Sequence, residues 1–116
     1  MRNYDKVKDS GRREAFPTGS KRDTRKGKGR YDLLPPNGIH RLAKHYENGA
    51  VKYGDRNWEI GQPSSRYMDS LLRHAFSYLA GKRDEDHLAA IAWNALGIMY
   101  NEDIKPDMDD LTGEVL

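Results

Sequence analysis

The residues with the richest chemistry stand where a predicted helix meets its exit loop, between positions 47 and 58. Glu47 lies beside the apolar stripe of that helix. A carboxylate there is costly to bury alone, so it either reaches water or holds a ligand or metal ion. Beyond it follow two cations that can hold phosphate, an amide that can read a base edge, and two rings that can stack on a base: Lys52, Tyr53, Arg56, Asn57 and Trp58. Trp58 can equally close the end of a helical bundle.

Further candidates lie on two later segments. His74 falls on an apolar helix face, where a hydrogen-bonded core histidine is the alternative to a ligand or catalytic group. Arg73 either neutralises phosphate or pairs with Asp69 four residues earlier. His87 and Asn94 share one face of the last helix. Burying an amide without partners costs about 1–3 kcal/mol, so Asn94 needs a ligand or a polar partner on another helix.

An acidic run, Asp84-Glu85-Asp86, precedes the last helix. Acidic residues are favourable at a helix N-terminus, which explains the run by itself. The same carboxylates are also suitable ligands for Mg²⁺ or Mn²⁺. Glu47, Asp86 and Glu85 are therefore the candidate metal ligands. The sequence contains no Gly-rich phosphate loop, nucleophile elbow or H-E-x-x-H motif.

Three amphipathic segments must position these side chains. Apolar residues recur at spacings of three and four from Ile39 onward, with Asn37 as the predicted N-cap and Gly54 as the stop. A second helix, apolar over a wide arc and mostly buried, is predicted from Arg66 to about residue 80, with Ser64 or Ser65 as its cap and Gly81 as its stop. A third helix is predicted from the acidic run to about residue 100. The pattern predicts an all-α fold, a small bundle of three main helices plus short turns.

Charge divides the chain into an arm and a body. Residues 1–30 hold 11 Lys and Arg against 4 Asp and Glu, a net charge of +7, whereas residues 31–116 hold 9 against 14, a net charge of −5. The arm lacks apolar periodicity, so we expect it to be largely disordered. It is either an electrostatic arm for nucleic acid or a solvated tail that docks on the acidic body.

Composition bounds the remaining possibilities. There is no run of about 18 apolar residues, so no membrane span is expected, and the absence of cysteine suits a reducing cytoplasm. A body of roughly 85 residues with three helices buries little surface alone. We therefore expect it to associate as a homodimer or homotetramer.

Three segments carry a family resemblance: YDLLPP at 31–36, RLAKHYENGAVKYGDRNWEIG at 41–61, and RYMDSLLRHAFSYLAGKRDEDHLAAIAWNALGIM at 66–99. In these the chain resembles the phage-type dATP/dGTP pyrophosphohydrolases, relatives of the MazG-like all-α NTP pyrophosphohydrolases. The resemblance implies Mg²⁺- or Mn²⁺-dependent hydrolysis of a purine deoxynucleoside triphosphate to the monophosphate and pyrophosphate, in phage nucleotide-pool metabolism. The paired E-x-x-E and E-x-x-D motifs of MazG-like enzymes are absent, and scattered acids stand in their place.

On this interpretation the candidate residues take four roles. Metal ligands come from the carboxylates; Lys52, Arg56 and Arg73 neutralise phosphate. His74, His87 and Asn94 position water, metal or a base edge. Tyr53 or Trp58 stacks on the purine, beside Asn57. The alternative function is a non-enzymatic phage nucleic-acid-binding protein that uses the basic arm.

Overall fold

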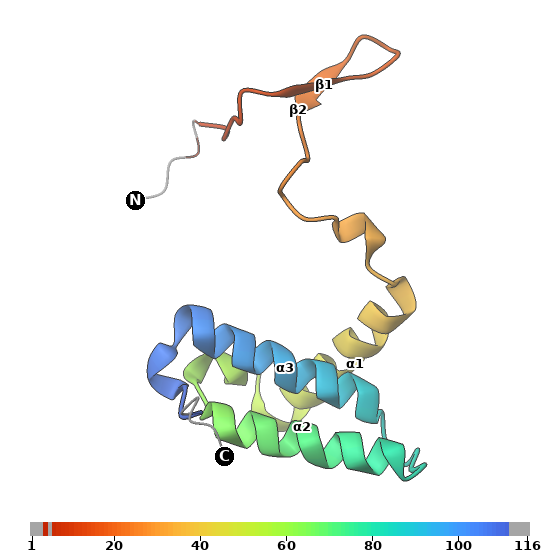
Figure 1. Ribbon diagram of the computed structural model, residues 1–116, viewed down its shortest axis with the longest axis vertical. Helices are drawn as coiled ribbons and strands as arrows, with labels where there is room; N and C mark the ends of the chain where they lie inside the picture. The colour runs from red at the N-terminus through yellow and green to blue at the C-terminus, as the bar shows by residue number, and fades with distance from the viewer. Residues whose placement is uncertain (1–3, 5, 112–116) are drawn as a thin grey trace. The chain divides into compact units, whose positions relative to one another are not determined.

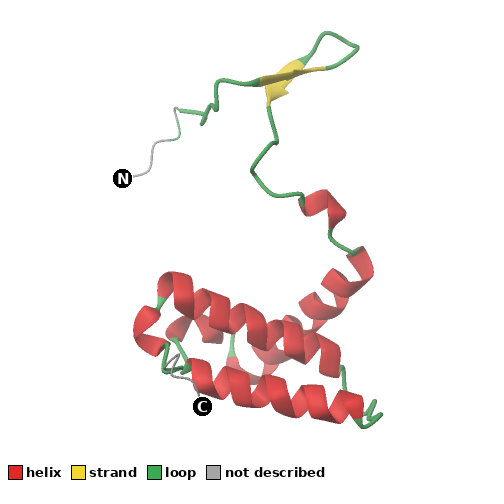
Figure 2. Ribbon diagram, viewed as in Figure 1, coloured by secondary structure: helices red, strands yellow, loops and turns green. Residues whose placement is uncertain are grey.

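The computed structural model describes residues 4 and 6–111, which fall into two compact units, residues 1–34 and 35–116. The second unit contains three α-helices within its described residues and confirms the predicted small helical bundle (Figure 1; Figure 2). Among the described residues, none of the helices combines the length and apolarity needed to cross a membrane.

Helix α1 spans Pro36–Tyr53. The predicted N-cap, Asn37, was wrong, because Pro35 occupies the cap position and Pro36 the first turn. Proline suits that position, since its fixed φ is helical and its missing N–H would have had no partner there. The predicted stop is confirmed: Gly54 takes a φ of 94° and its N–H donates to the Ala50 carbonyl.

Helix α2 spans Ser64–Leu79 and helix α3 spans His87–Ile104. Neither predicted serine caps α2, because Pro63 takes that position. The predicted acidic start of α3 is confirmed in detail by Asp86, whose carboxylate accepts a hydrogen bond of 3.0 Å from the Ala89 N–H. Helix α3 runs one turn beyond the expected end and stops before a 3-10 turn at Pro106–Met108.

The core lies where α3 packs against both other helices (Figure 1). Its buried apolar positions are small or aromatic: Tyr67 is 2% exposed, and Ala89, Ala90 and Gly97 are also buried. A Cβ at Gly97 would lie 2.6 Å from the Tyr67 ring, so glycine permits this close approach. Helix α2 is less buried than its apolar arc predicted. It contacts α3 with one face and leaves Phe76 exposed.

Aromatic rings extend this core toward α1. Trp93 lies edge-on to Tyr67 at a centroid distance of 5.4 Å and contacts Tyr46 at 6.2 Å. Trp58 stands on the short 3-10 segment Asn57–Ile60 and meets Tyr100 edge-on at 5.0 Å. Such edge-to-face contacts are the favoured geometry for aromatic pairs. The rings fix the exit of α1 against α3.

The unit of residues 1–34 contains an antiparallel hairpin of β1, Arg13–Ala15, and β2, Lys21–Asp23. Its turn places Pro17 after Phe16, whose carbonyl accepts from the Gly19 N–H at 2.8 Å. The sequence analysis did not predict these strands, since they lack apolar alternation. The expectation of disorder for the arm as a whole stays a prediction.

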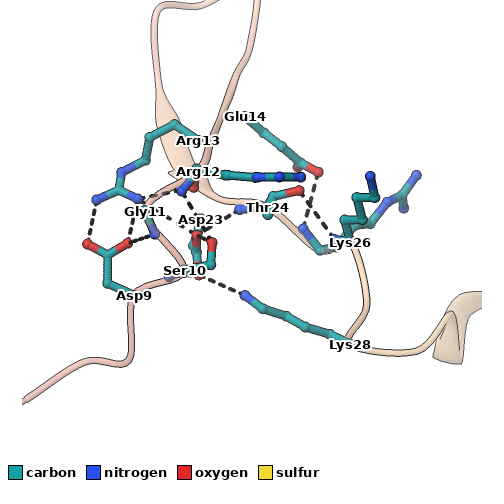
Figure 3. Close-up of polar contacts among 11 residues, drawn as sticks. Asp9, Ser10, Gly11, Arg12, Arg13, Glu14, Asp23, Thr24, Lys26 and Lys28 are labelled. Carbon is teal, nitrogen blue, oxygen red and sulfur yellow. Dashed lines mark hydrogen bonds and ion pairs between the residues drawn. The ribbon is translucent and has the colours of Figure 1, made fainter.

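Polar contacts hold the hairpin in place of a core (Figure 3). Asp23 accepts from the Ser10 N–H at 3.2 Å and from Lys28 Nζ at 3.0 Å. Arg13 forms two hydrogen bonds of 2.6 Å with the carboxylate of Asp9. These contacts hold the pKa of Asp9 and Asp23 below the usual value, through hydrogen bonds from Arg13 and Ser10 respectively. Part of the positive charge of the arm is therefore neutralised by its own acidic residues.

Candidate functional site

A cavity of about 1130 Å³ lies in the helical unit, along the polar face of α1 and the loop that follows it. Periodicity explains the face, because Arg41, His45, Asn48 and Lys52 recur at spacings of three and four and all line the cavity. The start of α3 supplies further walls. Most of the residues predicted from the sequence are gathered here: Glu47, Lys52, Tyr53, Arg56, Asn57, Trp58, Glu85 and Asp86.

The carboxylates of the cavity differ in whether another side chain already binds them. Glu47 is exposed and makes no hydrogen bond or ion pair with any described residue. Asp86 is fully engaged, because Arg41 donates to its two oxygens at 2.6 and 2.7 Å while the carboxylate also caps α3. The Arg41 contact lowers the pKa of Asp86 to about 2. Asp86 therefore holds α1 to the start of α3, whereas the carboxylate of Glu47 is free to meet a ligand.

The cations and rings lie at the exit of α1. Lys52 Nζ stands 5.5 Å from the centroid of the Tyr53 ring. Arg56 adopts a left-handed conformation with φ 56°, and its guanidinium lies 3.4 Å from the Glu59 carboxylate. Trp58 lines the cavity, and its ring packs edge-on against Tyr100 of the core. This packing is the structural role expected of Trp58, and its stacking on a base stays a prediction. This wall offers positive charge and an aromatic surface side by side.

Four predicted residues lie outside the cavity, and two of them, Asn94 and Arg73, make contacts with neighbouring side chains or backbone. Asn94 is 2% exposed, and its amide donates to the Ala90 carbonyl at 2.8 Å and to Ser70 Oγ on α2 at 3.4 Å. The polar partner that its burial demanded is therefore on a neighbouring helix. Arg73 lies on the surface of α2, 3.3 Å from the Asp69 carboxylate. Both residues make the contacts that a structural role requires.

The two predicted histidines lie together, apart from the cavity lining. His74 on α2 and His87 at the start of α3 face each other with their Nδ1 atoms 2.9 Å apart. Glu85 lines the cavity and also reaches this pair, its Oε1 lying 3.9 Å from His74 Nδ1. The candidate residues thus divide into a cavity and a histidine cluster that share Glu85.

Several residues of the cavity were not predicted from the sequence, among them Arg41, His45 and Trp93. Burial lowers the pKa of His45, whose ring lies 5.9 Å from that of Trp93. A neutral imidazole thus faces the cavity at pH 7. The signal that would have found Arg41 and His45 was the polar periodicity of α1, which repeats on the face opposite to its apolar stripe. Trp93 carried no such signal, because it continues an apolar run.

Carboxylates, cations, aromatic rings and an imidazole line one cavity of this mostly helical protein. The sequence model of the family described as dATP/dGTP diphosphohydrolase, N-terminal, matches residues 18–111, and the chain belongs to this family. The match confirms the resemblance carried by residues 31–99 and extends it over β2. Comparisons with curated proteins and with solved structures gave no match.

Proposed function

We propose that this protein hydrolyses a purine deoxynucleoside triphosphate, of the dATP or dGTP type, to the monophosphate and pyrophosphate in a metal-dependent reaction. The observation that carries the proposal is the cavity itself, in which the uncommitted carboxylate of Glu47 shares one space with Lys52 and Trp58. Family membership supports the same substrate class. The reaction would serve phage deoxynucleotide-pool metabolism in the host cytoplasm.

The donor set of the cavity fits Mg²⁺ or Mn²⁺. These ions take oxygen ligands, and Mg²⁺ in nucleotide sites is typically held by one or two carboxylates together with the substrate phosphates. Glu47 and Glu85 offer oxygens that no arginine holds. Asp86, the third predicted ligand, would have to release Arg41 to join them. Such an ion would neutralise phosphate charge and lower the pKa of a bound water.

The remaining side chains bind and orient the substrate. Lys52 and Arg56 neutralise phosphate oxygens at the exit of α1, and Tyr53 or Trp58 offers a ring face to the purine. His45 is kept neutral by burial, which leaves it able to accept a proton from the attacking water. Its location beside the acidic start of α3 suits that role.

Turnover of the full chain tests the proposal. Purified protein is incubated with each deoxynucleoside triphosphate and Mg²⁺ or Mn²⁺, and pyrophosphate release is measured. We expect dATP or dGTP to be the best substrate and Glu47→Gln to lower kcat/KM by about a hundredfold, since a metal or water ligand is lost. Glu102→Gln is the matched control, because Glu102 is an exposed glutamate of α3 outside the cavity.

Two results would overturn the proposal. One is the absence of pyrophosphate release from every nucleotide with either ion. The other is a Glu47→Gln variant that turns over substrate as fast as Glu102→Gln. If pyrophosphate release were equally fast without any divalent ion, the reaction would not depend on a metal. The proposed substrate would be unaffected by that result.

A further inference from the structure

Two histidines and a carboxylate converge at the junction of α2 and α3. Besides the 2.9 Å contact between His74 Nδ1 and His87 Nδ1, one ligand atom from each of His74, His87 and Glu85 lies within 4.8 Å of the others. Glu85 is half exposed, whereas the side chain of His87 is 4% exposed. Two imidazole nitrogens with one carboxylate oxygen form a metal-ligating set of a different kind from the carboxylates of the cavity.

The orientation of His87 is fixed from its other side. Asp84 places Oδ1 2.9 Å from His87 Nε2, so the ring donates its N–H to that carboxylate. The lone pair of His87 then lies on Nδ1, the atom that faces His74. A histidine whose far nitrogen donates to a carboxylate is the usual arrangement of a metal-bound imidazole, because the contact sets the tautomer and raises the basicity of the ligating nitrogen.

The spacing of the two nitrogens fits a shared ion. Two ligands about 2.05 Å from one metal lie about 2.9 Å apart at the right angle of octahedral coordination and about 3.3 Å apart at the tetrahedral angle. The observed separation of 2.9 Å matches the first, and a small opening of the pair gives the second. We propose that His74, His87 and Glu85 bind a divalent first-row transition metal ion such as Zn²⁺ or Co²⁺. Imidazole ligands favour these ions over Mg²⁺. Glu85 completes the set by a small rotation, because its exposed side chain is unrestrained by any arginine or lysine among the described residues.

The site goes beyond the proposed nucleotide chemistry, since it needs neither a nucleotide nor Glu47. Its position gives it a consequence for the cavity nonetheless. An ion on the histidines would draw Glu85 away from the cavity ions or hold it between the two sites.

Metal binding by the full chain tests the site directly. Protein stripped with a chelator is titrated with Zn²⁺ by calorimetry and with Co²⁺ by visible absorption, without nucleotide. We expect one ion per chain. His74→Gln should weaken binding at least about a hundredfold and Asp84→Asn about tenfold to a hundredfold. His40→Gln is the matched control, because His40 is an exposed histidine of α1 that is not part of the cluster.

Imidazole ¹⁵N spectra separate metal binding from a bare histidine pair. Zn²⁺ should shift the Nδ1 resonances of His74 and His87 and leave that of His40 unchanged. Three results would overturn the proposal: no uptake of Zn²⁺ or Co²⁺, uptake that His74→Gln leaves intact, or displacement by an equal concentration of Mg²⁺. The pair would then serve only as a histidine–histidine hydrogen bond. Because nucleotide turnover is not measured here, failure of this site and failure of the pyrophosphohydrolase activity are distinguishable.

Discussion

Gly97 offers the sharpest test of the packing that supports the cavity. An added Cβ would meet two ring carbons of Tyr67 at 2.6 Å, well inside van der Waals contact. The ring has little room to move, because Tyr67 is 2% exposed and lies edge-on to Trp93. Forcing it aside should cost about 1–3 kcal/mol. Alanine regains roughly 1 kcal/mol of helix propensity over glycine, so Gly97→Ala should be neutral to about 2 kcal/mol destabilising.

Gly49→Ala isolates the packing cost. Gly49 also lies inside a helix, but an added Cβ there meets no atom within 4 Å. This variant should therefore gain helix propensity alone and become more stable by about 0.5–1 kcal/mol. The difference in unfolding free energy between the two variants, measured by urea denaturation, should be about 1–3 kcal/mol.

The result also bears on the cavity, because Trp93 transmits any shift of the Tyr67 ring to the cavity wall. Tyr67→Leu should relieve the clash, so the double variant should be more stable than the sum of the single changes predicts. Equal stabilisation by alanine at positions 97 and 49 would refute the close approach of α2 and α3 on which this reasoning rests.

Three further predictions concern charge, stacking and association. Asp86 has a folded-state pKa of about 2 against a usual 3.8, so its contribution to stability is present above about pH 4 and is lost as the pH falls toward 2. Asp86→Asn should lower the free energy of unfolding by about 1 kcal/mol at pH 7, after allowance for solvent screening, and the difference between variant and wild type should vanish in acid denaturation near pH 2. Trp58→Leu should weaken nucleotide binding by about fivefold or more in equilibrium titration, and Trp58→Phe by less, because stacking on a base contributes about 1–3 kcal/mol; equal affinities would remove Trp58 from base binding. Leu96 and Met99 are partly exposed beside an apolar hollow on α3, so Met99→Lys should shift a dimer or tetramer toward monomer in sedimentation, and an unchanged mass would place the interface elsewhere.

Helix positions could be read from the sequence because their signals are local. The three- and four-residue spacing located all three helices, and Gly54 and Gly81 marked where two of them end. The first residue of each helix was harder to predict, because proline and a polar N-cap residue are favoured at nearly the same position. At α1 and α2 the proline took it, and at α3 Asp86 did.

The partial exposure of α2 and the presence of the hairpin were not predicted, for a different reason. An apolar arc shows which residues could be buried but not how many neighbours the fold provides. Leu72 and Leu79 belong to that arc and lie exposed, in a helix that was expected to be mostly buried. The hairpin depends on the contacts of Asp23 with Ser10 and Lys28, which are far apart in sequence and leave no periodic pattern.

The sequence predicted most of the individual residues of the candidate site but not which of them lie together. The loop after α1 was identified as one wall because its residues are consecutive. The approach of His74 to His87 follows from the packing of α2 on α3 and from ring orientations, neither of which the sequence specifies. Asn94 shows the useful limit of such reasoning, because its burial correctly required a polar partner while Ser70 could not be named in advance.

The acidic start of α3 shows why capping and chemistry need not be alternative explanations of one segment. Asp86 caps the helix and binds Arg41, which fixes the first turn of α3 against α1. With that turn fixed, its neighbours point in set directions. Glu85 lies between the cavity and the histidine cluster, Asp84 orients the imidazole of His87, and the imidazole is buried. By fixing this turn, Asp86 therefore places the adjacent residues where they can meet ligands, and removing its charge should disturb both sites together.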